Sequence, residues 1–192
     1  MKNLVQISLV CLAGTFLVPA VVEARELNIF AIDISDSVSH AVDRNVAQAA
    51  GDMVGSIVAG LQPGDEVRIR SLGAAGIAVG QFSINVTIGR KAKTRASRIA
   101  PAIGDFVRSL PDRVAKGQIA LQSNTNIIGF VEAIAPSLDC QTDKTRLILL
   151  TDGIEWSTQV RGSDLVSGKA QLPPPSGQIL KGCIVEMRGV GQ

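Results

Sequence analysis

Two short apolar runs stand out along the chain, and each of them leads directly to an aspartate. The first is Leu27–Asp33, and the second is Thr145–Thr151, which Asp152 follows. Both runs are nearly continuous in apolar residues, a pattern typical of strands that are buried on both faces. The sequence therefore predicts two buried strands that each deliver a carboxylate at the carboxyl end.

Three further segments are predicted strands of a more exposed kind. Glu66–Leu72 and Gln81–Ile88 alternate apolar with polar residues, which indicates strands with one face less covered. The connection between them, residues 73–80, is too short for a helical crossover, so we expect an antiparallel pair at a sheet edge. Cys183–Val190 is the last predicted strand.

A helical spacing of apolar residues follows the first strand and predicts one helix that starts near Val38. Val54 and Val58 widen its stripe, and Ser37 or Ser39 is placed to cap its free amides. The stripe consists of Val42, Val46, Ala49, Met53, Ile57 and Leu61.

Two more helices are predicted further along the chain. One carries the stripe Ile99, Ile103, Phe106 and Leu110, and Pro101 is expected in its first turn or at a kink. The other runs from Ile127 to about Ala135, where Pro136 should end it.

The alternation of strands and helices predicts an α/β fold with a doubly wound, mostly parallel sheet, helices on both faces and an antiparallel edge strand. In such a sheet, ligands bind beyond the carboxyl ends of strands where the winding reverses. The loops that follow Asp33 and Asp152 should then meet in one crevice.

The amino terminus has the composition of an export signal. Lys2 is its only early charge, residues 4–22 are apolar, and Val22-Glu23-Ala24 is a small-residue cleavage pattern. We predict a signal peptide over residues 1–24 with cleavage after Ala24, and a single domain over residues 25–192 in the periplasm or outside the cell. The alternative is an uncleaved membrane anchor, because the apolar run is nearly long enough to span a bilayer.

Composition excludes one class of partner and leaves another open. The 19 basic and 17 acidic residues nearly balance, and the chain has five Phe, one Trp and no Tyr for base stacking, so nucleic acid is not expected. The basic segment 90–98 either binds an anionic partner or is a solvated helix entrance. Loss of the signal removes Cys11 and leaves Cys140 and Cys183, an even number that favours a disulfide in an exported protein.

The candidate chemistry lies in three loops that present hard oxygen atoms. Asp33, Ser35 and Ser37 follow the first strand, Thr125 precedes a helix, and Asp152 follows the second buried strand. Carboxylates and hydroxyls of this kind suit Mg²⁺, Mn²⁺ or Ca²⁺. Each residue also has a simpler structural role, as a helix cap or as part of a strand-ending turn.

Together, D-x-S-x-S, the threonine before a helix and L-I-L-L-T-D-G resemble the metal-ion-dependent adhesion site (MIDAS) of von Willebrand factor A domains, here of an exported bacterial type. The resemblance covers Leu27–Gln192 in order and spacing. It implies that Ser35 and Ser37 bind a divalent cation directly, with Mg²⁺ first and Mn²⁺ or Ca²⁺ as alternatives. Thr125 would bind it directly or through water, while Asp33 and Asp152 would hold its water ligands.

The resemblance also implies a partner and shows one departure. In the family, a carboxylate from a partner protein often fills the remaining position on the ion. Family members usually continue with another helix and strand after the position of residues 189–191, which this sequence does not contain.

The leading functional hypothesis is a non-catalytic, metal-dependent protein-binding module of the bacterial envelope that captures an Asp or Glu of its partner. One alternative is a Mg²⁺-dependent phosphohydrolase, because an aspartate at the end of the first strand is similar to the nucleophile position of haloacid-dehalogenase-type enzymes. That family has a second aspartate where Ser35 stands here, and His40 is the only histidine. The other alternative is a structural subunit of an envelope assembly. No membrane span is expected after signal cleavage.

Overall fold

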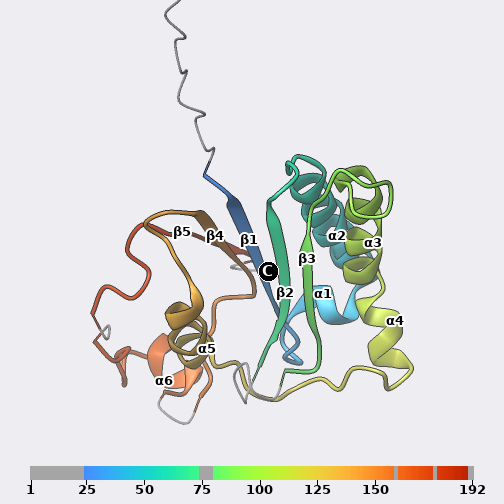
Figure 1. The fold of residues 1–192 in the computed structure, drawn as a ribbon. Coiled ribbons are helices and arrows are strands. Elements are labelled where there is room, and N and C mark those ends of the chain that lie inside the picture. The colour runs from blue at the N-terminus through green and yellow to red at the C-terminus, as the bar shows by residue number, and fades with distance from the viewer. Residues whose placement is uncertain (1–23, 74–79, 158–159, 175–176, 190–192) are drawn as a thin grey trace, which may run out of the picture.

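Five strands form one mixed sheet in the computed structural model, which describes residues 24–73, 80–157, 160–174 and 177–189 (Figure 1). Their order across the sheet is β3-β2-β1-β4-β5. β1 pairs in parallel with β2 and with β4, β4 pairs in parallel with β5, and only β2 and β3 are antiparallel. The predicted doubly wound sheet with an antiparallel edge is confirmed. The strands are β1 Glu26–Asp33, β2 Glu66–Leu72, β3 Ser83–Thr87, β4 Lys144–Leu150 and β5 Ile184–Arg188.

Helices cover both faces of this sheet. In Figure 1, α2, α3 and α4 lie on one side and α5 on the other. A short 3-10 helix over Ala135–Ser137 follows α5 directly and contains Pro136, so the expected helix end is confirmed. The helices are α1 Ser39–Val42, α2 Arg44–Ala59, α3 Ala96–Arg108, α4 Leu110–Ala115, α5 Ile127–Ile134 and α6 Gly162–Val166.

The alternating side chains of β1 divide the core into two layers. Phe30 and Ile32 face the layer that includes Val54 of α2 and Ile103 of α3. Ile29 and Ala31 face the layer that includes Phe130 of α5. Because β1 lies between two parallel neighbours and under both layers, Leu27 through Asp33 are all buried, as the continuous apolar run predicted.

The single helix predicted after β1 is wrong in one respect, since the structure has two helices separated at Asp43. This residue has extended backbone angles, and its carboxylate accepts hydrogen bonds from the N–H groups of Asn45 and Val46. It therefore caps α2, whereas neither Ser37 nor Ser39 caps a helix with its side chain. A carboxylate at this position satisfies two free amides and starts a new helix.

The buried stripe of α2 is also rotated from its predicted position. Ala47, Gly51, Val54 and Val58 are buried, whereas Val42 lies outside α2 and is exposed. The reason is a close crossing with α3, where a Cβ on Gly51 would lie 2.7 Å from the carbonyl oxygen of Gly104. Glycine at the crossing lets the two backbones approach, so the contact face is centred on small residues that an apolar count overlooks.

Pro101 lies in the interior of α3, beyond the first turn, which was one of its two expected positions; the other was a kink in the helix. Two other expectations concern residues that the structure does not describe. The predicted leader, apart from Ala24, and the Gly- and Ala-rich connection over 74–79 both fall outside the described ranges. Within those ranges, no helix is long and apolar enough to cross a membrane.

A disulfide joins the amino ends of β4 and β5. Cys140 and Cys183 are bonded, with their Cα atoms 4.8 Å apart, and each precedes one of these two parallel strands. The expected disulfide is confirmed, and it lies at the sheet end opposite the candidate metal ligands. This covalent link fixes the start of β5, which is an edge strand of the sheet.

Candidate metal centre

Asp33, the last residue of β1, is the most deeply buried member of the candidate site. Its side chain is fully buried. Oδ1 accepts a hydrogen bond from the N–H of Ser35 at 2.8 Å, and Oδ2 accepts one from the hydroxyl of Thr151 at 2.7 Å. Both carboxylate oxygens are therefore held in place by neighbouring residues at the carboxyl end of the sheet.

The two serines of the same loop continue this chain of oxygen atoms toward Asp152. Ser35 Oγ lies 3.1 Å from Ser37 Oγ, and the Ser37 hydroxyl donates to Asp152 Oδ2 at 2.9 Å. The other oxygen of Asp152 accepts from the N–H of Ile154 at 3.0 Å, which fixes the turn after β4. Ser35 is buried and Ser37 is exposed, so the cluster extends from the core to the surface.

Thr125 brings the third loop to the same place. Its hydroxyl lies 3.5 Å from Asp33 Oδ1, and its backbone forms two hydrogen bonds with Trp156, with N–O distances of 3.0 and 2.7 Å. This small bridge joins the loop before α5 to the loop after β4. All five residues predicted from the sequence as metal ligands are thus gathered at the carboxyl ends of β1 and β4.

Glu155 is a supporting residue that the sequence reasoning missed. Its side chain is buried, and Oε2 accepts from the N–H groups of Ile127 and Ile128 at 2.7 and 3.2 Å. Asn126 caps the same helix by accepting from the N–H of Gly129. Glu155 therefore ties the loop after β4 to the start of α5, next to Thr125. No local sequence pattern predicts this role, because the contact joins residues 28 positions apart.

Thr151 and His40 are two further residues whose roles emerge only from the fold. Thr151 holds Asp33 Oδ2, although the sequence identified it only as part of a strand-ending pattern. His40 is buried, and its Nε2 lies 2.7 Å from the carbonyl oxygen of Asp33. Because a carbonyl oxygen only accepts, the ring donates from Nε2 and braces the end of β1.

Burial shifts the pKa values of Asp33 and His40 in opposite directions. Desolvation raises the pKa of Asp33 above its ordinary value, a shift that the hydrogen bonds from Ser35 and Thr151 oppose. Desolvation likewise lowers the pKa of His40, so the ring is neutral at pH 7. An ionised Asp33 therefore lacks compensating positive charge, and a bound cation would supply it.

The geometry of the oxygen atoms fits a small divalent cation. In an octahedral Mg²⁺ site with bonds of 2.0–2.1 Å, adjacent ligand oxygens lie about 2.9 Å apart. The Ser35–Ser37 and Ser37–Asp152 oxygen pairs have separations of 3.1 and 2.9 Å. Among the described residues, no three His, Cys, Asp or Glu side chains form a metal-binding group, so hydroxyl oxygens would have to complete any ligand set.

Apolar side chains lie exposed beside this cluster. Ile154 and Trp156 are 45% and 40% exposed and follow Asp152 closely in the chain. The exposure of Trp156 and its backbone bridge to Thr125 place it at the rim of the cluster. A partly exposed tryptophan of this kind is common at protein interfaces.

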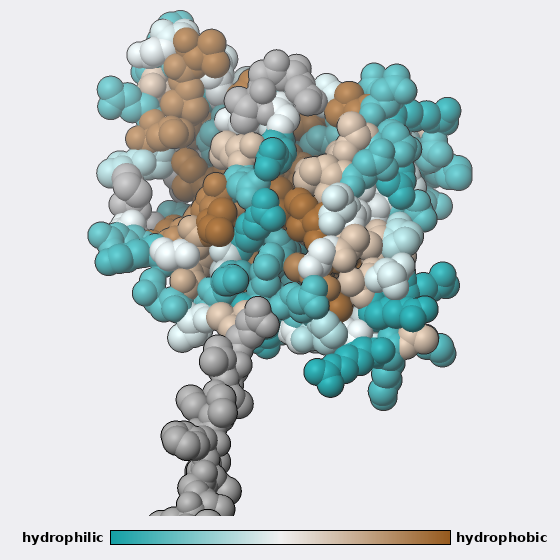
Figure 2. Space-filling view, turned by 90° about the horizontal axis from the view of Figure 1, so that it is seen from above, coloured by the Kyte–Doolittle hydropathy of each residue, from teal (hydrophilic) through white to brown (hydrophobic). Residues whose placement is uncertain are grey.

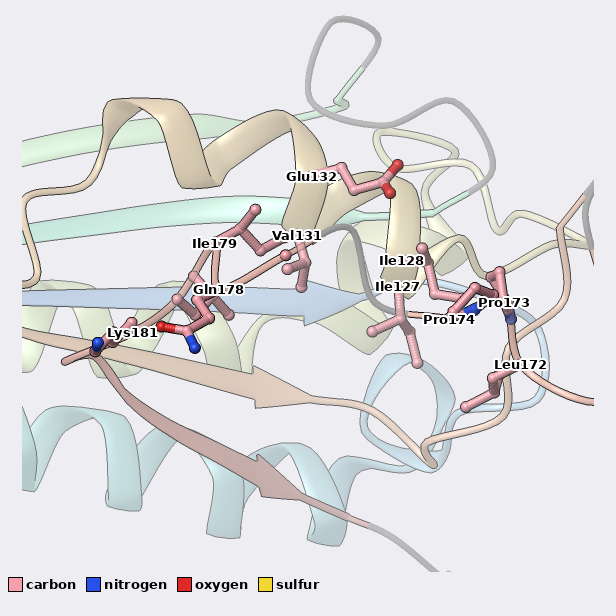
Figure 3. A pocket seen from close by; sticks show the side chains of 12 residues that line it. Ile127, Ile128, Val131, Glu132, Leu172, Pro173, Pro174, Gln178, Ile179 and Lys181 are labelled. Atoms are coloured by element: carbon pink, nitrogen blue, oxygen red, sulfur yellow. The ribbon is translucent and has the colours of Figure 1, made fainter.

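An apolar groove lies on the α5 side of the sheet, and its lining includes Ile127, two residues after Thr125. Its volume is about 950 Å³, and Figure 3 shows Val131 and Ile179 lining it from α5 and from the segment before β5. Exposed hydrophobic residues also gather on the left of Figure 2, the side of the molecule that carries α5 and β5 in Figure 1. Pro173 and Pro174 form one end of this groove.

Comparisons with known proteins give matches in solved structures only. No protein-family model matches the sequence, and no curated protein matches it. A von Willebrand factor type A structure from Catenulispora acidiphila is 16% identical with a TM-score of 0.48, covering 88% of this chain and 34% of that one. Proximal thread matrix protein 1 from the mussel byssus is 14% identical with a TM-score of 0.47, covering 85% and 37%.

A third similar structure is the pilus adhesin SpaC from Lactobacillus rhamnosus GG in its open conformation. It is 20% identical with a TM-score of 0.42, over 69% of this chain and 15% of that chain. The chain thus spans well under half the length of each of these three structures. At identities of 14–20%, the similarity to these proteins concerns the fold alone.

Proposed function

We propose that the chain is a non-catalytic protein-binding module that captures a carboxylate of its partner through a divalent cation. The observation that carries this proposal is the spacing of the Ser35, Ser37 and Asp152 oxygens, which matches adjacent ligands of one small cation. Thr125 and Asp33 complete the set at the same sheet edge. Mg²⁺ is the expected ion, and Mn²⁺ or Ca²⁺ would use the same oxygen atoms.

The charges of the site favour capture of an external acid. Ser35, Ser37 and Thr125 are neutral donors, and only Asp33 and Asp152 among the five residues carry negative charge. A divalent cation held mainly by hydroxyls keeps much of its charge, which favours a carboxylate in the open position. Ile154 and Trp156, exposed beside the site, would supply apolar contacts to the same partner.

The arrangement of the site supports binding over hydrolysis. A phosphohydrolase of the kind considered above needs a second carboxylate two positions after Asp33, and Ser35 occupies that position. His40, the only histidine in the sequence, donates to the Asp33 carbonyl and is buried, so it is not free to move a proton on a substrate. A permanent structural subunit remains the second candidate, and its loops would serve the same ion.

The test combines metal binding with partner capture. We expect calorimetry to show one Mg²⁺ or Mn²⁺ site and affinity capture from envelope extract to depend on that ion. Thr125→Ala should abolish capture while leaving the circular dichroism spectrum unchanged. Thr87→Ala, an exposed threonine on β3, is the matched control and should capture normally.

Two results would count against this proposal. One is capture that persists unchanged in chelator, which would mean that the ion is not part of the interface. The other is a stable complex that never dissociates and is required for the chain to stay soluble, which would favour the structural subunit.

A further inference from the structure

The loop between β3 and α3, together with the first turn of α3, carries an unusually dense group of basic side chains. Five of the nine residues over 90–98 are lysine or arginine, all five are exposed, and the segment contains no acidic residue. None of the five forms an ion pair with another described residue, whereas arginines elsewhere in the described chain, such as Arg108, do. We call these residues the basic loop: Arg90, Lys91, Lys93, Arg95 and Arg98.

The backbone of the segment before α3 forms hydrogen bonds within the segment, which makes it an ordered turn. The N–H of Gly89 donates to the carbonyl of Thr94 at 2.9 Å, and the N–H groups of Thr94 and Arg95 both donate to the carbonyl of Lys91 at 3.0 Å. A Cβ on Gly89 would lie 2.4 Å from the Thr94 hydroxyl, so the turn closes tightly there. Since these bonds use the backbone, the basic side chains are left projecting into solvent.

The strand register places this loop at a defined end of the molecule. β3 is antiparallel, and its last residue, Thr87, lies opposite Glu66, the first residue of β2. The basic loop therefore lies at the amino end of the parallel strands, where β1 begins (Figure 1). The predicted apolar leader joins the domain at this same end, directly before Arg25.

Acidic residues at this end do not neutralise the loop. Glu66 and Asp143 both pair with Arg25, with N–O distances of 3.0 Å. Asp65 accepts hydrogen bonds from the backbone N–H groups of Glu26 and Gln62 at 2.9 and 2.7 Å. The acids are thus engaged locally, and Figure 2, seen from this end, shows hydrophilic residues along the side that carries the helices.

We propose that the basic loop docks the domain on a membrane surface by binding anionic lipid headgroups. The predicted leader would direct the chain to a membrane, and the loop lies at the end of the sheet where β1 begins, shortly after that leader in the sequence. Each basic residue near an anionic surface adds roughly fivefold to membrane partitioning. The loop has no aromatic residue on which a base would stack, which disfavours nucleic acid as the partner.

Docking in this way would orient the candidate metal centre. β1 has eight residues, so its two ends are about 26 Å apart. With the basic loop on the lipid, the carboxyl end of the sheet, where Asp33 and Asp152 lie, would point away from the membrane toward a partner. This inference rests on the export and binding function proposed above, yet the two sets of residues lie several Debye lengths apart and can be tested separately.

The test is vesicle co-sedimentation of residues 25–192, which contain every helix and strand of the described ranges. Vesicles of phosphatidylcholine with about a third phosphatidylglycerol are compared with pure phosphatidylcholine. The variant Arg90→Gln, Lys93→Gln, Arg95→Gln should lose about a hundredfold in binding to the anionic vesicles. Binding by the unaltered chain should also fall steeply with added salt.

The matched control removes the same three charges from exposed sites elsewhere, in the variant Lys116→Gln, Arg161→Gln, Lys169→Gln. It should retain most of the binding, and equal loss in both variants would overturn the proposal, as would equal binding to neutral vesicles. Binding of an acidic peptide or of DNA without vesicle binding would also overturn it. Mg²⁺ affinity, measured on the same preparations, should be the same in all three proteins, and its absence alone would reject the metal-binding function instead.

Discussion

The two ends of the sheet are built from opposite kinds of interaction. At the carboxyl end, Asp33 is fully buried among hydroxyls, and its pKa is raised by desolvation. At the amino end, Arg25 pairs with the half-buried carboxylates of Glu66 and Asp143, and a disulfide joins Cys140 to Cys183. One end therefore concentrates polar groups that cost folding energy, while the other contains links that stabilise the fold.

This difference indicates where function and stability lie in the molecule. Buried carboxylates without a cation are costly, and such sites commonly serve binding rather than folding. A disulfide that closes a long loop stabilises the folded protein, because it restricts the conformations of the unfolded chain. Changes at the amino end should therefore alter stability with little effect on metal binding, whereas changes at the carboxyl end should alter metal binding.

The largest effect is expected from the amino end. Cys140→Ser with Cys183→Ser opens a link between residues separated by 43 positions, which should lower the free energy of unfolding by about 4 kcal/mol. Urea unfolding measures the loss, and Mg²⁺ affinity of the folded double variant should match that of the unaltered chain. Free thiols at both positions in the exported protein would contradict the assignment.

The next largest effect is a gain at the carboxyl end when the ion binds. Mg²⁺ at one hundred times its dissociation constant should stabilise the protein by about 2.7 kcal/mol, because it binds only the folded state. Thermal unfolding with and without the ion measures the gain, and Thr125→Ala should reduce it sharply. A Tm that does not respond to Mg²⁺, Mn²⁺ or Ca²⁺ would remove the basis for a metal centre.

Glu155→Ala should lower the free energy of unfolding by about 2 kcal/mol, since two buried N–H groups at the start of α5 lose their acceptor. Glu155→Gln keeps an acceptor oxygen and should lose less. Urea unfolding of both variants gives the comparison, with Mg²⁺ titration reporting on the neighbouring Thr125 loop. Equal losses would show that charge, and not the two accepted bonds, is what matters there.

Asp33→Asn should stabilise the metal-free protein at neutral pH by roughly 1 kcal/mol, because a buried carboxylate is replaced by a neutral group. A carboxyl whose folded pKa is raised favours the fold below its unfolded pKa and loses that contribution as the pH rises through the folded pKa. The advantage of the variant should therefore be present near pH 7.5 and vanish toward pH 4. Thermal unfolding in chelator across this range checks the sign, and the same variant should not bind Mg²⁺.

The smallest effect is expected from Arg25→Gln, which removes two surface ion pairs. Arg25 is 52% exposed, so the loss should be small and should shrink in high salt. Urea unfolding at two salt concentrations measures it. A loss comparable to that of the disulfide variant would mean that the amino end is held by charge more than by its covalent link.

Much of the fold could be read from the sequence because its strands have strong signals. Leu27–Asp33 and Thr145–Thr151 are buried on both faces, and continuous apolar runs of this length leave little choice of structure. The five candidate metal ligands could also be recognised in the sequence, because each stands just after a strand or before a helix. The position of β3 followed from a connection too short for a helix.

The features that the sequence did not reveal depend on contacts between distant residues. His40 braces Asp33 and Glu155 caps α5 only after β1, β4 and α5 have come together. The break at Asp43 depended on one local choice, since an aspartate within a helical pattern either faces solvent or starts a new helix. The Gly51–Gly104 crossing was hidden because glycine carries no apolar signal, although its lack of a side chain is what shapes the contact.

The position of β1 between β2 and β4 has a consequence for the order in which the chain can assemble. β1 is the first strand to be synthesised, yet its partner β4 begins at Lys144, more than one hundred residues later. A chain that emerges amino end first must keep one edge of its most apolar strand unpaired until most of the sequence has followed. The Asp152 loop comes later still, so loading of the ion would have to follow the delivery of nearly the whole polypeptide.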